Sequence, residues 1–182
     1  GRPGDYASAM AQKQIVPCIW LDDQAEAAAA FYVRHLPAGR IVATSRYPES
    51  VGNPGGKPPG SVLTVEFEVG GQRFTALNGG PMFQPNPSVS FFVQVDTPGE
   101  ADRIFAPFAD GVAVLMPIDA YPWSERYGWV QDRFGFSWQV VPDRIAAWMA
   151  GSDPAARDRA FAAMLTMGKL DVAALERAYE GR

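Results

Sequence analysis

The side chains that most often perform chemistry in proteins are few in this chain. It contains one cysteine, Cys18, in an apolar segment, and one histidine, His35, directly after Arg34. A cysteine nucleophile needs a neighbouring base or cation to lower the pKa of its thiol, and no histidine is expected near Cys18. Cys18 is therefore predicted to be a small core residue, and His35 a surface residue of a helix.

Charged and aromatic residues gather in one segment, 123–139. This segment contains Glu125, Arg126, Tyr127, Asp132 and Arg133. The simpler interpretation is that an arginine–carboxylate pair braces a hairpin here. The functional alternative is that Tyr127 or Glu125 reaches over a binding cleft and orients a substrate.

Neutral polar and aromatic side chains on predicted strands are the candidate ligand contacts. Strand alternation could point several of them into a cleft, where rings and uncharged hydrogen-bonding groups would suit a flat, apolar ligand. For Trp20 and Trp138, packing in the core is an equally good interpretation, and for Gln94 so is exposure to solvent. The candidates are Trp20, Asn78, Ser90, Gln94, Tyr127, Trp138 and Gln139.

Composition narrows the class of protein. The 182 residues carry a net charge of −4 and only three widely spaced lysines, which argues against a nucleic-acid surface. No apolar run is long enough to span a membrane, and the first residues do not form a signal peptide. A single cysteine excludes an internal disulfide and fits a reducing compartment. A soluble, cytoplasmic protein that binds neither nucleic acid nor membrane is expected.

An internal repeat sets the expected architecture. The stretch from Asp22 to Phe31 recurs 74 residues later, from Asp96 to Phe105, and each copy follows a run of β-forming residues. Each copy has an Asp at the strand exit, an acid four residues on and an aromatic residue nine residues on. A period of this length indicates a duplicated half-domain rather than a solenoid repeat.

The first half is predicted to be βαβββ. Asp22 or Asp23 should cap the helix, which should end near Leu36. Strands are expected at 15–21, 41–47, 61–69 and 72–77, with a Gly/Pro-rich loop at 48–60 and a hairpin turn at Gly70-Gly71.

The second half is predicted to repeat this plan. Asp96 should cap a helix over 98–108, and a loop is expected at 119–124. Strands are expected at 89–95, 112–118, 127–131 and 136–141, with a hairpin turn at 132–135. The tail should form helices near 144–150, 154–167 and 172–179, with Asp153 and Asp171 as caps, and its apolar residues should cover a sheet face or a subunit interface: Phe161, Met164, Leu165, Leu175 and Tyr179.

Several segments resemble the glyoxalase/bleomycin-resistance/dioxygenase superfamily, also called the vicinal oxygen chelate fold. The closest likeness is to its PhnB-like branch, whose members are often labelled "3-demethylubiquinone-9 3-methyltransferase". The Trp-rich segment 123–139 is the most specific carrier of the resemblance, which is also carried by 15–20, 61–67 and 74–80. The resemblance runs from about Lys13 to the C-terminus. It implies an α+β fold in which two βαβββ modules form a curved mixed sheet around a cleft, with C-terminal helices added.

Metal-dependent members of this superfamily place four ligands on the first and last strands of the two halves. Carried onto this chain, those positions fall on Pro17, on Thr75 or Ala76, on Ser90 and on Gln139. Only Gln139 offers a reasonable donor for a divalent ion. No metal is expected at this place.

The methyltransferase label implies S-adenosylmethionine as a cofactor, which is commonly held by a glycine-rich turn between a strand and a helix. The glycine pairs here lie in a Pro-rich loop (Gly55-Gly56), in a hairpin (Gly70-Gly71) and in a linker (Gly79-Gly80). None leads from a strand into a helix, so no cofactor is expected.

The favoured hypothesis is a metal-independent binding protein for a small molecule. The alternative is an enzyme of the same superfamily, an isomerase, lyase or transferase-like protein, that acts on a small organic substrate. A homodimer is expected, with the cleft formed within one chain or between exchanged halves, and the C-terminal helices are candidates for its interface. The expected parts are an N-terminal extension over 1–12, modules over 13–80 and 81–142, and a helical tail over 143–182.

Overall fold

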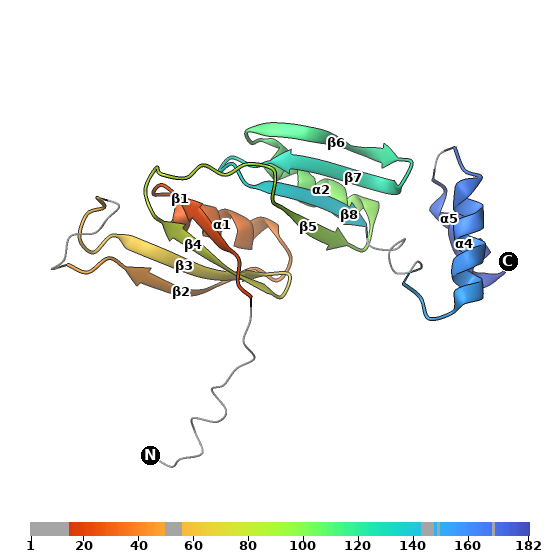
Figure 1. Cartoon of the computed structure of the whole chain (residues 1–182), viewed down its shortest axis with the longest axis horizontal. Helices are drawn as coiled ribbons and strands as arrows, with labels where there is room; N and C mark the ends of the chain where they lie inside the picture. Colours follow the sequence, from red (N-terminus) through yellow and green to blue (C-terminus); the bar gives the residue numbers. More distant parts are fainter. Residues whose placement is uncertain (1–14, 50–55, 143–147, 149, 169) are drawn as a thin grey trace, which may run out of the picture. The chain divides into compact units, whose positions relative to one another are not determined.

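A computed structural model describes residues 15–49, 56–142, 148, 150–168 and 170–182. The chain divides into two compact units, Gly1–Phe83 and Gln84–Arg182. Each unit contains a four-stranded mixed sheet with one helix along one of its faces (Figure 1). No helix among the described residues is long and apolar enough to cross a membrane.

The first unit follows the predicted βαβββ order. Its strands lie in the order β1-β4-β3-β2, with β1 parallel to β4 and the other pairs antiparallel. The elements are β1 (Cys18–Leu21), α1 (Ala25–His35), β2 (Arg40–Arg46), β3 (Val62–Val69) and β4 (Gln72–Asn78).

The core of the first unit lies between α1 and one face of the sheet. Tyr32 of α1 stacks on Phe67 of β3, with ring centroids 5.6 Å apart, and Phe67 stacks on Phe74 of β4 at 5.3 Å. All three side chains are buried. Because strand residues alternate between faces, their neighbours Glu66, Glu68 and Thr75 point to the other face, which we call the far face of the sheet.

The second unit repeats this order. Its strands lie in the order β5-β8-β7-β6, again with the first and last strands parallel. The elements are β5 (Ser90–Val95), α2 (Pro98–Ala109), β6 (Ala113–Tyr121), β7 (Ser124–Gln131) and β8 (Ser137–Pro142). The shared strand order confirms the α+β fold of two βαβββ modules.

One predicted loop belongs instead to a strand. Residues 119–121 continue β6, which also runs through Pro117, and β7 begins at Ser124 rather than at Tyr127. Pro117 is tolerated because β6 is the last strand in the sheet order, where a proline need not donate to a further strand. The β6–β7 pairing shows register shifts over the same stretch. The turn between these strands is therefore only Pro122-Trp123.

The predicted caps of the first two helices were wrong by one or more residues. Gln24 occupies the N-cap position of α1, but its side chain accepts no hydrogen bond from the helix. The N–H of Ala25, the first residue of the helix, donates to Oδ1 of Asn78 at 2.8 Å. Asp22 forms an ion pair with Lys57 at 2.5 Å. In the second unit Thr97, not Asp96, caps α2 through a hydrogen bond from the N–H of Glu100.

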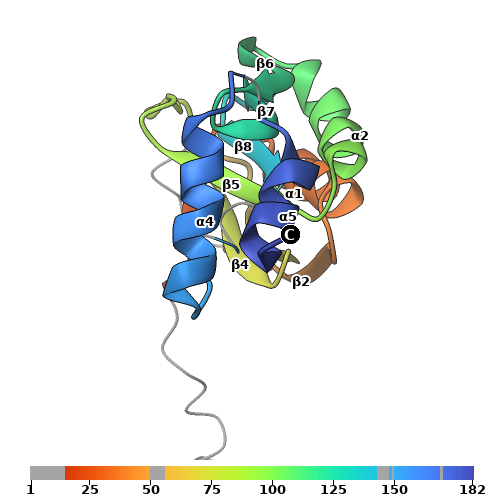
Figure 2. The ribbon, with the colours of Figure 1, turned by 90° about the vertical axis from the view of Figure 1, so that its right-hand side faces the viewer.

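The tail forms a helical hairpin. Asp153 and Asp171 cap α4 (Pro154–Leu165) and α5 (Val172–Glu180), as predicted. These two helices pack side by side (Figure 2), and Arg159 of α4 donates to two carbonyls at the end of α5. Leu175 is buried in this hairpin, whereas Leu165 is 71% exposed. Most of the helix predicted near 144–150 lies outside the described residues.

Candidate functional site

Three of the predicted contact residues are joined by hydrogen bonds on the face of the second sheet that points away from α2. We call this the far face of the second sheet. The hydroxyl of Tyr127 on β7 donates to Oε1 of Gln139 on β8. Nε2 of Gln139 donates in turn to Oγ of Ser90 on β5, at 2.7 Å. The relay crosses three adjacent strands, from β7 through β8 to β5.

The packing of α2 shows which face carries this relay. Trp138 contacts Phe108 of α2, with ring centroids 5.5 Å apart, and a side chain at Gly128 would collide with Phe105 of α2. Trp138 and Gly128 therefore point toward the helix. Gln139, the neighbour of Trp138 along β8, points to the far face, as does Tyr127, the neighbour of Gly128 along β7.

Further neutral groups surround the relay. Nε1 of Trp129 donates to Oγ of Ser137 at 2.6 Å, and Nε2 of Gln131 donates to the carbonyl of Gly135 at 2.9 Å. Phe92, which lies opposite Gln139 in the strand register, is 62% exposed. This part of the far face combines aromatic rings with uncharged hydrogen-bonding groups.

An aromatic cluster adjoins the relay at the β6–β7 hairpin. Tyr121 stacks on Trp123, with ring centroids 5.1 Å apart, and contacts the ring of Tyr127 edge-on at 5.7 Å. Tyr127 thus belongs to both the cluster and the relay. The sequence prediction missed Tyr121, Trp123, Trp129 and Phe92. Period-two alternation around Tyr127 would have found Trp129.

The environment of Tyr127 keeps its hydroxyl protonated. Desolvation by burial raises the pKa of this phenol above its ordinary value, and the nearby Tyr121 raises it further. Tyr127 is therefore a hydrogen-bond donor at neutral pH, and a poor base. Ser90 accepts the bond from Gln139 and, among the described residues, donates none, so its proton is available to a ligand or to water.

Trp138 lies on the helix side of the same sheet. It is buried between Phe91 and Phe108, and its Nε1 donates to Oδ2 of Asp132 at 2.8 Å. The buried carboxylate of Asp132 also accepts from the N–H of Phe134 and of Phe136. The structure thus gives Trp138 a core position and gives Asp132 the role of organising the β7–β8 hairpin.

The other three candidates are not members of the relay. Trp20 donates through Nε1 to the carbonyl of Gly80 at 2.8 Å, and Asn78 is buried with Nδ2 donating to the carbonyl of Val62. Both belong to the first unit. Gln94 is an exposed residue of β5.

The two arginines of segment 123–139 brace the hairpins against α2 and its C-terminal end. Arg126 contacts Asp102 of α2 at 2.7 Å, and Arg133 contacts Asp110, directly after α2, at 3.2 Å. The bracing interpretation was therefore right about Arg126 and Arg133, but their carboxylate partners lie outside the segment.

The donor set does not fit the metal site that the predicted superfamily resemblance implies. Strand register places Thr75 and Gln139 at equivalent positions, and Ser90 beside Gln139. A hydroxyl pair and one amide are poor ligands for Zn²⁺ or Ni²⁺. Within the described ranges, no group of three or more His, Cys, Asp or Glu residues could hold a metal ion.

The strand-to-helix turns do not fit the usual S-adenosylmethionine site either. Such a site uses a glycine-rich turn between a strand and a helix. Here the turns are Asp22–Gln24, between β1 and α1, and Asp96-Thr97, between β5 and α2, and neither contains glycine.

Comparison with known proteins places the chain in a family. Residues 13–141 match the family model described as 3-demethylubiquinone-9 3-methyltransferase, and the chain belongs to this family. The predicted resemblance to PhnB-like proteins that carry this label is confirmed. No curated relative matches significantly.

Solved structures agree with the family match. A putative 3-demethylubiquinone-9 3-methyltransferase, PhnB protein, from Bacillus cereus is 31% identical with a TM-score of 0.64; the alignment covers 71% of this chain and 99% of that one. Protein PA1353 from Pseudomonas aeruginosa is 27% identical with a TM-score of 0.58, over 72% and 98% of the two chains. The family match ends at residue 141, before α4 and α5, so the prediction that the resemblance extends to the C-terminus was wrong.

Proposed function

We propose that this protein binds a small, planar, largely apolar molecule on the far face of its second sheet, without a metal ion. The observation that carries this proposal is the relay from Tyr127 through Gln139 to Ser90. It presents a hydroxyl donor beside exposed aromatic surface at Phe92. Rings with a few fixed polar groups are typical of sites for small apolar ligands.

The contrast between the two sheets supports this assignment. Since Thr75 corresponds to Gln139 by register, Glu66 in the first sheet corresponds to Trp129 in the second. The far face of the first sheet carries ion pairs, Glu66 with Arg73 at 3.6 Å and Glu68 with Arg40 at 2.7 Å. An apolar ligand would have to displace or cover these charges there, which disfavours the first sheet.

The enzyme alternative receives less support from the same residues. Tyr127 holds its proton, and its hydroxyl is already bonded to Gln139. Catalysis by proton transfer needs a group whose pKa lies near the working pH. A neutral donor that orients a ligand is the role that suits Tyr127.

The test uses acridine, a planar molecule that is uncharged at neutral pH, in a fluorescence titration. The variants Ser90→Ala and Gln139→Ala remove the relay, and each should weaken binding about tenfold, because a polar group that the bound ligand shields from water then lacks its partner. Gln72→Ala is the matched control, since Gln72 is an exposed glutamine of β4. Equal acridine binding by Gln139→Ala and the unsubstituted protein would refute the proposal.

A homodimer remains part of the proposal. Phe161 and Leu165 lie one helical turn apart on α4, are 43% and 71% exposed, and lie beyond the part of the chain that matches the family model. An apolar pair at this spacing suits helix-on-helix packing. We propose that α4 supplies the dimer contact.

A further inference from the structure

The tip of the β6–β7 hairpin exposes an indole ring beside the relay. Trp123 sits in the two-residue turn and is 56% exposed, although it stacks on Tyr121. Its ring also contacts Tyr127 edge-on, with centroids 6.2 Å apart. Stacking on Tyr121 supports the indole from one side and leaves exposed ring surface for a ligand. Indole is the aromatic side chain that attracts cations most strongly.

The cations of the second module are all neutralised within it. Residues 84–142 contain no lysine and three arginines. Each arginine has a carboxylate partner: Arg103 lies 3.5 Å from Glu100, and Arg126 and Arg133 lie 2.7 and 3.2 Å from Asp102 and Asp110. An anionic ligand would find no uncommitted positive charge among the described residues of this module.

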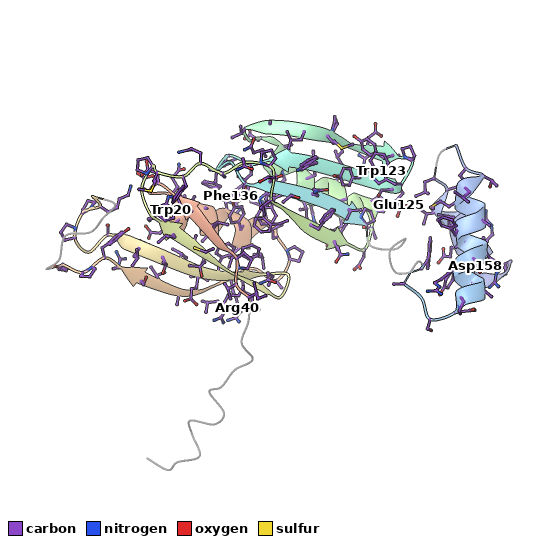
Figure 3. All side chains as sticks on the ribbon, in the orientation of Figure 1. Trp20, Arg40, Trp123, Glu125, Phe136 and Asp158 are labelled. Carbon is purple, nitrogen blue, oxygen red and sulfur yellow. The ribbon has the colours of Figure 1, made fainter. Side chains whose placement is uncertain are left out.

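Carboxylates, in contrast, lie beside the aromatic cluster. Asp119 is opposite Tyr127 in the β6–β7 register, so both side chains are on the far face, and the Asp119 side chain is 73% exposed. Its contact with Arg126 is long, at 4.0 Å, because Arg126 bonds to Asp102. Glu125 precedes Tyr127 by two residues in β7 and lies at the same end of the sheet as Trp123 (Figure 3), but its Oε1 is buried, so Asp119 is the exposed carboxylate.

We propose that this hairpin selects the charge of the ligand, so that the second module binds a planar aromatic cation. The ring system stacks on Trp123, and the positive charge lies beside Asp119, whose side chain is exposed. This inference rests on the proposed function, because a ligand that stacks on Trp123 also contacts Tyr127, which is a member of the relay. It adds a cation-binding subsite to a face whose relay is uncharged.

The experiment compares three ligands with one ring system. The ligands are 9-aminoacridine, a cation at neutral pH; acridine, which is neutral; and acridine-9-carboxylate, an anion. We expect 9-aminoacridine to bind about tenfold more tightly than acridine, and the carboxylate to bind most weakly. The preference for the cation should decrease as salt is added, because ions screen exposed charges.

Two variants locate the subsite. Asp119→Asn should abolish most of the preference for 9-aminoacridine while acridine binds as before. Trp123→Ala should weaken the binding of both ligands, because both stack on the indole, and should also reduce the preference for the cation, because the cation–π contact is lost. Asp158→Asn is the matched control: Asp158 is an exposed carboxylate on α4 (Figure 3), and its substitution should leave the preference intact.

The outcomes separate this inference from the proposed function. Equal binding of the cation and of acridine, a preference for the anion, or a cation preference that survives in both Trp123→Ala and Asp119→Asn would overturn the subsite. Acridine binding that depends on Gln139 would still support the proposed function in each case. A complete failure to bind 9-aminoacridine would also overturn the subsite, whether or not acridine binds.

Discussion

Gln139 and Thr75 occupy equivalent positions in the two sheets but differ in what their side chains do. In the parallel pair of each sheet, Thr75 lies opposite Cys18 and Gln139 lies opposite Phe92, and these two partners are 74 residues apart, the spacing of the repeat. Gln139 links Ser90 to Tyr127 by hydrogen bonds. Among the described residues, the equivalent strands of the first half carry no corresponding relay.

Asn78→Ala should destabilise the protein by about 1–3 kcal/mol, because a buried amide is lost together with two bonds. Its Oδ1 accepts from the N–H of Ala25, and its Nδ2 donates to the carbonyl of Val62. Urea unfolding gives the measurement. Asn86→Ala is the control, since Asn86 is exposed and should change stability little. Equal stabilities of the two variants would contradict the capping role of Asn78.

Asp132→Asn should cost about 2–4 kcal/mol of unfolding free energy. The carboxylate accepts three hydrogen bonds, from the N–H groups of Phe134 and Phe136 and from Nε1 of Trp138. An asparagine amide would turn an NH₂ group toward one of these donors. Thermal unfolding should show a large decrease for this variant and almost none for Asp110→Asn, an exposed residue. A small effect at Asp132 would show that its hydrogen bonds contribute little.

Stability should fall at alkaline pH partly through Tyr127. Burial and the neighbouring Tyr121 raise the pKa of Tyr127 in the folded protein, whereas an unfolded tyrosine ionises near pH 10. The folded state therefore holds this proton longer, and the stability that it contributes is lost as the pH rises from about 10 through the folded pKa. Unfolding free energies measured from pH 8 to 11 should decrease less steeply in Tyr127→Phe. Identical slopes would refute the assignment.

Cys18 should react slowly with alkylating reagents. The prediction that Cys18 is a core residue was wrong, because its side chain is exposed on the first strand. Partial desolvation still raises the pKa of its thiol above the ordinary value, so little thiolate is present at neutral pH. Iodoacetamide should modify native Cys18 several-fold more slowly than the urea-unfolded protein at pH 7.5, and the difference should narrow as the pH rises. Faster modification of the native protein would indicate an activated thiol instead.

The dimer proposal predicts that Leu165→Glu yields a monomer. A carboxylate at this exposed apolar position of α4 would be buried without a partner in a helix-to-helix contact. Light scattering after size exclusion gives the mass. Ala155→Glu introduces the same charge in the first turn of α4, where an acid is favourable, and should leave the mass unchanged. A monomeric unsubstituted protein would disprove the proposal outright.

The fold could be predicted because its signals are local. The alternation over 61–69 and the Gly70-Gly71 turn specify a strand and a hairpin without knowledge of the rest of the chain. The stretch 117–121 has two features of a loop, Pro117 and Asp119, and it becomes a strand through its pairing with β7. Such tertiary pairing leaves no local trace in the sequence.

The candidate site was predicted in part, for a related reason. Ser90, Tyr127 and Gln139 could be named because alternation and the family resemblance both marked strand positions. Alternation does not say which face of a strand meets the helix, so Trp138 was grouped with Gln139 although it contacts α2. The bond from Ala25 to Asn78 spans 53 residues and required the folded structure.

The central claim is that a planar ligand binds on the far face of the second sheet. An NMR titration of the ¹⁵N-labelled protein with acridine tests it most directly, because indole N–H signals report on both sheets. We predict large shifts for the indole of Trp129 and for the side-chain amide of Gln139, and none for the indole of Trp20, which donates to Gly80 in the first unit. Shifts confined to Trp20 and the first sheet, or no shifts at all, would contradict the account.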